Sequence, residues 1–270
     1  MTTILMYHQI AELSKEQDPL GLSTPPAQFE QQMDYLARNG YTCLTLAEAV
    51  QYFQQGERTP SRLFVLTFDD GYQDLFSVIR PILEKHGFTA TVFLVAGRMG
   101  LMSNWQGQDK ERAGLLLSKT EAQELVRHGF IFGSHTISHP FLRTLDERSV
   151  LEEIRRSKAL LQESLKVQVD YFSYPYSQTD DHIEDLVRSA GYKAACAGDV
   201  GSWSLFHLWR VPCVSKDTPL SFAFKVSGLY ERRTALRESA PVQLLRRGVH
   251  MIRGRQAASH PTERTKGIHG

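Results

Sequence analysis

Two adjacent carboxylates, Asp69 and Asp70, follow directly after the apolar run LFVLTF at residues 63–68. Such a run predicts a buried strand, and active sites of parallel α/β folds form where strands end. Neighbouring carboxylates are costly to bury unless a cation or hydrogen bonds stabilise them. Gly71 lets the chain turn, so both groups could face one pocket. The structural alternative is that Asp70 caps the next helix and Asp69 is solvated.

A pair of histidines, His135 and His139, follows another predicted strand, FIFGS at residues 130–134. Residues four apart lie on one face of a helical turn, which suits two imidazoles that bind one metal ion. The alternative is a pair of loop histidines with ordinary hydrogen-bond partners. On its own, the HTISH spacing therefore indicates a metal site without establishing one.

Together, the two clusters supply one carboxylate and two imidazoles, a ligand set that leaves coordination positions open. Such a set suits a catalytic zinc ion, and it also matches the facial triad of non-haem iron oxygenases. The second carboxylate separates these interpretations, because a hydrolase needs a base that takes a proton from water activated by the metal. Asp69, beside Asp70, is available for that task.

Three segments in this order, TFDDG at residues 67–71, HTISH at 135–139 and FSYPY at 172–176, resemble the polysaccharide deacetylase family. This family is also called the NodB-homology group or carbohydrate esterase family 4. The opening MYHQI at residues 6–10 is similar to the subgroup that includes the exopolysaccharide poly-N-acetylglucosamine deacetylases. The resemblance covers about residues 1–230.

The resemblance implies a role for each matched residue. Asp69 corresponds to the family's general base, and the metal ligands correspond to Asp70, His135 and His139. Tyr176 stands where the family uses a backbone N–H to hold the oxyanion. An N–H aimed at a developing oxyanion contributes about 2.7–4 kcal/mol to catalysis.

Two positions depart from the family pattern. The third motif usually carries an arginine that holds the base, and Tyr174 replaces it here. Arg210 could supply that guanidinium and keep Asp69 charged, unless it is an ordinary surface arginine. The usual late LxxH motif, which carries the general acid, has no convincing match after residue 214. His8 is the candidate that protonates the leaving amine, and the alternative is a packed structural histidine.

Strand-like and helix-like segments alternate along the chain, which predicts βαβ units and a parallel sheet. The predicted strands are residues 2–7, 63–68, 89–95, 130–133, 169–174, 192–197 and 209–214. The pattern alone fits both a barrel and an open doubly wound sheet. The resemblance implies an α/β fold that is a deformed (β/α) barrel of about seven parallel strands.

Three regions are expected along the chain. Residues 1–62 supply an N-terminal strand and helices integrated with the barrel, residues 63–230 form the NodB-homology deacetylase domain, and residues 231–270 form a basic, partly disordered tail. Capping boxes predict the starts of three helices, at Thr45 with Glu48, Ser118 with Glu121, and Thr144 with Glu147. Trp105, in a long polar loop, could stack on a sugar or anchor that loop.

The composition is that of a soluble globular protein, since 41% of the 270 residues are hydrophobic and 23% are charged. No stretch approaches about 18 consecutive apolar residues, and the N-terminus lacks the basic and apolar regions of a secretory signal. Three widely spaced cysteines without a CxxC pattern fit reduced thiols. We therefore expect a cytoplasmic protein.

The net charge of +1 conceals an asymmetry. Residues 231–270 hold nine Lys/Arg and three Asp/Glu, whereas the rest of the chain has a net charge of −5. Because apolar residues are interspersed, the tail is a candidate for binding an anionic membrane surface, which would place the protein at the inner face of the membrane. A solvated tail is the alternative. Nucleic acid is not an expected partner, because no aromatic residues interleave with the charge.

The predicted function is metal-dependent hydrolysis of the N-acetyl group from N-acetylhexosamine units of a polysaccharide or lipid-linked glycan, with release of acetate. The expected cofactor is a divalent metal ion, zinc first, with cobalt or nickel as alternatives. Two other functions remain open from the residues: a 2-His-1-carboxylate iron oxygenase and a non-catalytic carbohydrate-binding relative.

Overall fold

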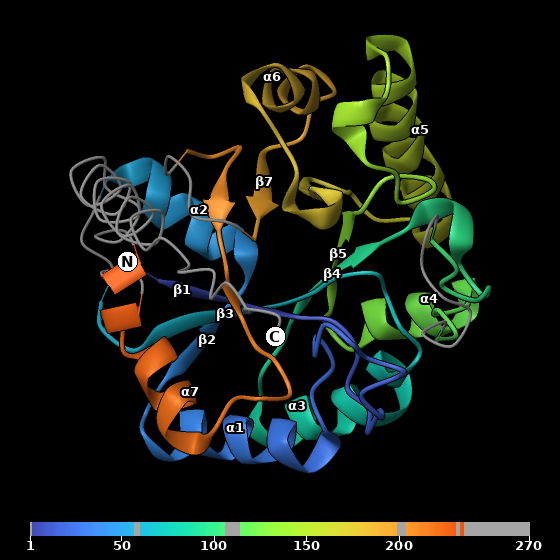
Figure 1. Cartoon of the computed structure of the whole chain (residues 1–270). Helices are drawn as coiled ribbons and strands as arrows, with labels where there is room; N and C mark the ends of the chain where they lie inside the picture. Colours follow the sequence, from blue (N-terminus) through green and yellow to red (C-terminus); the bar gives the residue numbers. More distant parts are fainter. Residues whose placement is uncertain (1, 57–59, 106–113, 199–203, 231–232, 235–270) are drawn as a thin grey trace, which may run out of the picture. The chain divides into compact units, whose positions relative to one another are not determined.

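The computed structural model describes residues 2–56, 60–105, 114–198, 204–230 and 233–234 (Figure 1). The chain divides into two compact units, Met1–Leu229 and Tyr230–Gly270. Apart from residues 233 and 234, the predicted basic tail 231–270 lies outside the described residues. Within the described ranges, no helix combines the length and the apolar character that crossing a membrane requires.

Nine parallel strands form one sheet in the described residues. They are β1 Thr3–Tyr7, β2 Thr42–Leu44, β3 Leu63–Phe68, β4 Thr91–Leu94, β5 Ile131–Ser134, β6 Tyr171–Ser173, β7 Ala194–Ala197, β8 Leu208–Trp209 and β9 Val211–Pro212. Most of these segments were expected from their apolar runs. The exception is β2, a short and partly exposed strand that pairs beside β3.

The two ends of the sheet meet, and this closes the barrel. The strand order is β8-β7-β6-β5-β4-β3-β1-β9, and only Arg210 separates β8 from β9. One stretch of chain therefore pairs with β7 through Leu208 and with β1 through Val211. With β8 and β9 taken as one interrupted strand, the barrel has seven strands, and β2 is an addition beside β3. The predicted deformed (β/α) barrel is confirmed, and the open doubly wound sheet is not.

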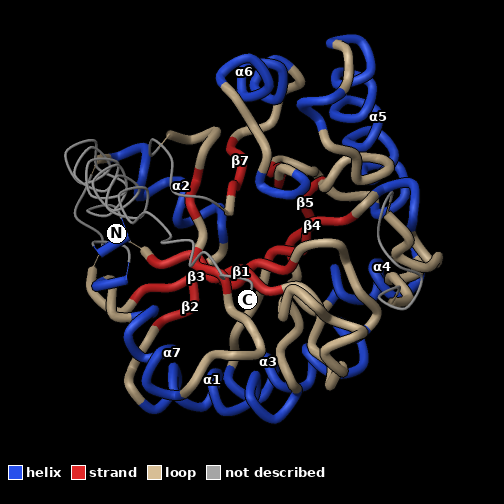
Figure 2. The backbone as a smooth tube through the Cα atoms, in the orientation of Figure 1, coloured by secondary structure: helices blue, strands red, loops and turns tan. Residues whose placement is uncertain are grey.

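Helices surround the strands (Figures 1 and 2). The α-helices of the described residues are α1 Pro26–Arg38, α2 Leu46–Gln55, α3 Arg80–His86, α4 Lys119–Arg127, α5 Glu147–Leu165, α6 Asp181–Ser189 and α7 Pro219–Val226. A π-helical turn, η1 Leu75–Ile79, leads into α3, and short 3₁₀ turns are η2 Ala96–Arg98, η4 Leu142–Thr144 and η5 Pro175–Ser177.

Helix starts follow local hydrogen bonds. The capping boxes predicted at Thr45 and Ser118 are both present. The one predicted at Thr144 is wrong, since Asp146 caps α5 by accepting the backbone N–H three residues later at 2.8 Å. The Thr144 hydroxyl instead donates to the Phe141 carbonyl at 2.7 Å inside a 3₁₀ turn. A hydroxyl that finds a nearby carbonyl is no longer available as a cap.

The strands bury large aromatic side chains. Phe64, Phe68, Phe93 and Phe172 are fully buried, and burying such a side chain contributes about 1.5–3 kcal/mol. The largest fully buried side chain is charged, however: Arg210, at the point where the barrel closes. A buried guanidinium requires a partner, and its partner lies at the carboxyl end of β3.

Candidate metal centre and its neighbouring carboxylate

The turn after β3 sends two neighbouring carboxylates in different directions. Asp69 remains bonded to the sheet through its N–H, which donates to the Tyr7 carbonyl at 3.0 Å. Asp70 then adopts a left-handed conformation with φ 70°, followed by Gly71 at φ 80°. A Cβ on Gly71 would lie 2.3 Å from the Leu94 side chain, so this position requires glycine. Both carboxylates are buried, which excludes a solvated Asp69.

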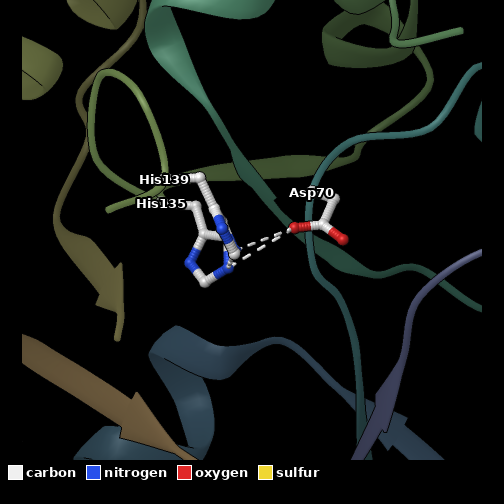
Figure 3. A group of neighbouring side chains, drawn as sticks. All are labelled: Asp70, His135 and His139. Atoms are coloured by element: carbon white, nitrogen blue, oxygen red, sulfur yellow. Dashed lines mark hydrogen bonds and ion pairs between the residues drawn. The ribbon is translucent and has the colours of Figure 1, made fainter. Parts of the chain in front are cut away.

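Asp70 does not cap a helix. The helical segment that follows begins after Asp74, and no side-chain cap bond is present there. The capping alternative for Asp70 is therefore wrong, and its carboxylate faces the two histidines instead (Figure 3).

The histidine loop, residues 135–140, follows β5. It is not helical, because Thr136 and His139 have φ values of 70° and 62°. Non-glycine residues in this region are strained, and such strain clusters at functional sites. The His139 N–H donates to the Thr136 hydroxyl at 2.9 Å, which stabilises the reversed turn. The spacing of four thus brings the imidazoles together through a strained loop rather than through a helical turn.

Three potential metal-binding atoms converge from Asp70, His135 and His139 (Figure 3). The His139 Nε2 lies 3.3 Å from Asp70 Oδ1 and 3.2 Å from His135 Nε2, and the latter lies 3.6 Å from the same oxygen. All three residues are buried. Two imidazole nitrogens and one carboxylate oxygen in this arrangement fit a divalent transition metal ion with open coordination positions.

The imidazoles are neutral and oriented for this purpose. Burial lowers the pKa of His135 to about 4, and burial together with His135 lowers the pKa of His139 well below its usual value. The His135 Nδ1 lies 2.8 Å from the Ser173 carbonyl oxygen. Because a carbonyl oxygen can only accept a hydrogen bond, Nδ1 carries the hydrogen. The Nε2 lone pair then points into the cluster, as in metal sites whose ligand histidines are oriented by a carbonyl.

Asp69 forms a bidentate ion pair with Arg210. Its two oxygens each lie 2.7 Å from a guanidinium nitrogen, and the arginine is completely buried. Thr67 and Ser173 accept further bonds from Arg210 at 3.2 and 2.9 Å. Burial alone would raise the pKa of Asp69, but Arg210 and then His135 outweigh it and hold that pKa well below its usual value. The carboxylate is therefore ionised.

Arg210 thus occupies the place expected for the missing motif arginine, and the alternative of a surface arginine is wrong. The residue that replaces the motif arginine, Tyr174, is buried and points elsewhere, since its hydroxyl donates to the Phe206 carbonyl at 2.9 Å.

His8 and Tyr176 flank the metal centre. His8 is half-buried just after β1 and lines a small cavity together with Asp70. Its charge acts on Asp69, so it lies within electrostatic reach of that carboxylate. Tyr176 has a left-handed backbone, with φ 56°, and its ring lies 4.6 Å from the ring of His139. Burial and the nearby Asp70 raise the pKa of Tyr176 to about 12, so its hydroxyl stays neutral.

Aromatic rings cover His139. The indole of Trp105 is buried and stacks on this imidazole at 4.5 Å. Tyr176, whose ring also contacts His139, is in turn stacked on Phe141 at 3.8 Å. Trp105 therefore packs directly against one of the potential metal ligands.

Two residues of the site were not found from the sequence. Ser173 contacts Asp69 and Arg210 through its hydroxyl and His135 through its carbonyl. Glu153, on α5, accepts hydrogen bonds from the histidine loop. Ser173 lies at a strand end inside the FSYPY segment, which is a signal that could have indicated it. The spacing of Glu153 carries no comparable signal.

The chain is similar to known proteins. The family model for polysaccharide deacetylase matches residues 56–195. YxkH of Bacillus subtilis is 29% identical over 201 residues, which cover 74% of this chain and 66% of the relative. Poly-beta-1,6-N-acetyl-D-glucosamine N-deacetylase of Staphylococcus aureus is 27% identical over 180 residues, which cover 63% and 59%. The chain thus spans less than two thirds of the length of these curated relatives.

A solved structure is similar over most of its length. The deacetylase PplD of Streptococcus pyogenes, in complex with acetate, aligns with a TM-score of 0.73 and 25% identity. The alignment covers 83% of this chain and 97% of PplD. The barrel described above is therefore the fold of a known deacetylase.

Proposed function

Since this chain belongs to the polysaccharide deacetylase family, we propose that it hydrolyses the N-acetyl group of N-acetylhexosamine units in a polysaccharide and releases acetate. One observation carries the proposal: an ionised, arginine-held carboxylate, Asp69, lies next to the cluster of Asp70, His135 and His139. The similarity to the Staphylococcus aureus enzyme supports a β-1,6-linked poly-N-acetylglucosamine as the substrate class.

The family is metal-dependent, and this chain supplies a suitable donor set. We propose zinc at Asp70, His135 and His139, because zinc in hydrolases is held by three protein ligands of this kind. Cobalt and nickel accept the same donors. The ion supplies a Lewis acid that polarises the acetyl carbonyl and lowers the pKa of a water molecule to about 7.

Asp69 is the proposed general base. Its bidentate pair with Arg210 fixes both carboxylate oxygens, so that the base is already oriented before the substrate binds. The same guanidinium lowers the pKa of the carboxyl group, so the carboxylate is ionised at neutral pH and able to accept a proton from the attacking water.

Tyr176 and His8 are assigned to the two charges that develop as the amide is cleaved, on the acetyl oxygen and on the leaving amine. The Tyr176 N–H is proposed to donate to the oxyanion that develops on the acetyl group, and its left-handed backbone beside His139 supports this assignment. His8 is proposed to protonate the leaving amine, because it borders the cavity that contains Asp70.

The iron oxygenase alternative gives no role to the buried ion pair of Asp69 and Arg210. An oxygenase uses its two histidines and carboxylate to hold iron, but it has no proton for Asp69 to accept from water. The buried pair of Asp69 and Arg210 therefore favours hydrolysis.

The decisive assay measures acetate release from N-acetylglucosamine oligomers by the purified chain, first stripped of metal and then supplied with Zn²⁺ or Co²⁺. We expect acetate only with metal and no oxygen consumption when Fe²⁺ and a reductant are supplied. Absence of acetate from every acetylated glycan tested, although metal is bound, would support a non-catalytic carbohydrate-binding protein and overturn the proposal.

Where the substrate is encountered is a separate proposal. The basic, apolar-containing residues 231–270 support binding to anionic lipid at the cytoplasmic membrane face, and thus a lipid-linked glycan substrate. Sedimentation with vesicles that contain an anionic lipid should depend on these residues. Full binding by a chain that ends at residue 230, or recovery of the protein from the periplasm of fractionated cells, would contradict it.

A further inference from the structure

A glutamate outside every recognised motif holds the histidine loop. Glu153 lies on α5, and its Oε2 accepts the backbone N–H groups of Ile137 and Ser138 at 2.8 and 3.1 Å. Its Oε1 accepts the Ser138 hydroxyl at 2.7 Å. The two residues it holds lie between His135 and His139. One carboxylate therefore makes three hydrogen bonds to the segment that joins two of the proposed metal ligands.

The opposite side of the same loop is bonded to the turn after β4. Ala96 and Gly97 donate their N–H groups to the carbonyls of Thr136 and Ile137, both at 2.9 Å. A Cβ on Gly97 would lie 2.8 Å from the Ile137 carbonyl oxygen, so this approach is close. Two loop carbonyls are thus bonded from η2, and two loop N–H groups are bonded to Glu153.

The histidine loop is not tightly packed by side chains on this face, so packing does not substitute for these hydrogen bonds. A cavity of about 530 Å³ lies beside the loop and is lined by residues of the loop and of α5, including Ser138, Ser149 and Glu153. Glu153 forms no ion pair within the described residues, whereas its neighbour Glu152 pairs with Arg156 at 3.1 Å. The carboxylate of Glu153 is therefore committed to the loop.

The loop needs such support, because Thr136 and His139 are both held in the left-handed region. Strained conformations persist only where surrounding interactions determine them. Without Glu153, two N–H groups would lose their acceptor and the loop could relax. His139 would then move relative to His135 and Asp70, whose ligand atoms lie 3.2 and 3.3 Å away from its Nε2.

From this geometry we infer that Glu153 is a positioning residue for the metal centre: it contacts no reacting atom, and it fixes the loop so that His139 and His135 can bind the same ion. The inference rests on the proposed metal site and deepens it. Partners of metal ligands typically change metal affinity by about 10–100-fold when they are removed, and Glu153 acts one step further out, through the backbone.

The test measures the zinc dissociation constant of the full chain by competition with a chromophoric chelator at one fixed pH. Glu153→Ala should weaken zinc binding by about 10-fold or more. Glu153→Gln retains an oxygen for the two N–H groups and an amide that donates to the Ser138 hydroxyl, so its dissociation constant should stay within about fivefold of wild type. Glu152→Ala is the matched control on the same helix, and it should bind zinc as wild type does.

The outcomes separate this inference from the proposed function. Equal zinc affinity of Glu153→Ala and Glu152→Ala overturns the positioning role and leaves the deacetylase proposal intact. Failure of the folded wild-type chain to bind zinc, cobalt or nickel overturns the metal site and the inference with it. If Glu153→Ala does not fold, Glu153→Asp provides the decision, because its shorter carboxylate should lose reach to the loop and weaken zinc binding. Wild-type affinity in that variant contradicts the inference.

Discussion

Two parts of the site differ in how their charges are balanced. The base side consists of the proposed base Asp69 and its partner Arg210, and the metal side consists of the proposed metal ligands Asp70, His135 and His139. Asp69 and Arg210 form a complete pair of opposite charges at the point where the barrel closes. Asp70, His135 and His139 instead bring three potential ligand atoms toward one another, within 4.8 Å, on turns that include left-handed residues. On the base side, the charge of Asp69 is therefore balanced by a residue of the protein itself. On the metal side, the three potential ligand atoms are placed so that they can bind a cation.

This contrast has consequences for stability. The base side shares its hydrogen bonds with β3, β6 and the junction of β8 with β9, so damage to it should propagate into the barrel. The metal side depends on a loop that is supported from α5 and η2, so damage to it should remain local.

The largest effect is expected from Arg210→Leu. Removal of one partner of a buried ion pair costs about 3–5 kcal/mol in the free energy of unfolding, because the other charge remains buried and unpaired. Arg143→Leu is the control, since that side chain is 58% exposed and should change stability by about 0.5 kcal/mol or less. Denaturant unfolding at pH 7 measures both, and equal effects would contradict the contrast.

The pH dependence of the same pair has a definite sign. The folded pKa of Asp69 is held below its unfolded value, so its contribution to stability is present above about pH 3.9 and is lost as the pH falls toward the folded pKa. In Arg210→Leu the unpaired, buried Asp69 is relieved of its charge as the pH falls, and below about pH 3.9 the wild-type pair also loses its contribution, so the gap in stability between the two chains should narrow as the pH falls. A gap that does not change with pH would show that Asp69 is not ionised in the wild-type fold.

On the metal side, zinc rather than the fold should provide the stability. Zinc at about 1,000 times its dissociation constant should stabilise the wild-type chain by about 4 kcal/mol. His139→Gln should abolish this increase and leave the metal-free chain little changed, because the His139 Nε2 contacts only the other two potential ligands, Asp70 and His135, and its Nδ1 makes no hydrogen bond within the described residues. Thermal unfolding with and without zinc measures both. A large loss of stability in the metal-free variant would contradict the local character of this side.

A third carboxylate, that of Asp74, can be compared with the paired carboxylate of Asp69. Asp74 lies five residues after Asp69 and is half-buried, with its Oδ1 shielded from solvent. Within the described residues it has no cation partner, and burial of the carboxylate raises its pKa to about 6. Above that pH a charge is buried at a cost, so Asp74→Asn should stabilise the fold by up to about 3 kcal/mol at pH 8. Below about pH 4 both side chains are neutral, and the difference should vanish.

The measurement is chemical denaturation of both chains at pH 8 and pH 4. Asparagine can still accept the Ile10 N–H that Asp74 accepts now. A destabilising effect of Asp74→Asn at pH 8 would show that this carboxylate is stabilised by something other than that single N–H.

The smallest effect is expected from Ser173→Ala. This change removes the hydroxyl that lies 2.9 Å from Arg210 and 3.3 Å from Asp69, and it leaves the carbonyl that accepts from His135. Each of these two hydrogen bonds contributes about 1 kcal/mol, so the free energy of unfolding should fall by about 1–2 kcal/mol. Zinc affinity should stay unchanged, and titration calorimetry with zinc checks this second point. A parallel loss of zinc affinity would show that the two sides are coupled through Ser173.

The core of the site could be predicted from the sequence because its residues are concentrated in short motifs. Asp69, Asp70, His135 and His139 lie directly after apolar strands, and parallel strands bring their carboxyl ends together. No local pattern connects Arg210 with Asp69, because 141 residues separate them. Arg210 was a candidate only because the FSYPY segment lacks the arginine that the family usually carries there. Its burial results from closure of the barrel, which no local pattern reveals.

Glu153, strand β2 and the cap of α5 could not be predicted, because each depends on contacts between elements or on weak local patterns. Glu153 and Glu152 are adjacent residues of the same type in a charged helical segment, and only the docking of α5 beside the histidine loop distinguishes them. Strand β2 is too short and too exposed to show a strand pattern. The cap of α5 was misplaced by two residues because the hydroxyl of Thr144 bonded to a closer carbonyl.

The central claim is that one aspartate of the pair serves as a base and its neighbour as a metal ligand. Zinc binding and acetate release should therefore be measured together for Asp69→Asn and Asp70→Asn. The account predicts that Asp69→Asn binds zinc as the wild-type chain does while acetate release falls by about 10²–10⁴-fold, and that Asp70→Asn loses both. Wild-type acetate release by zinc-loaded Asp69→Asn would contradict it.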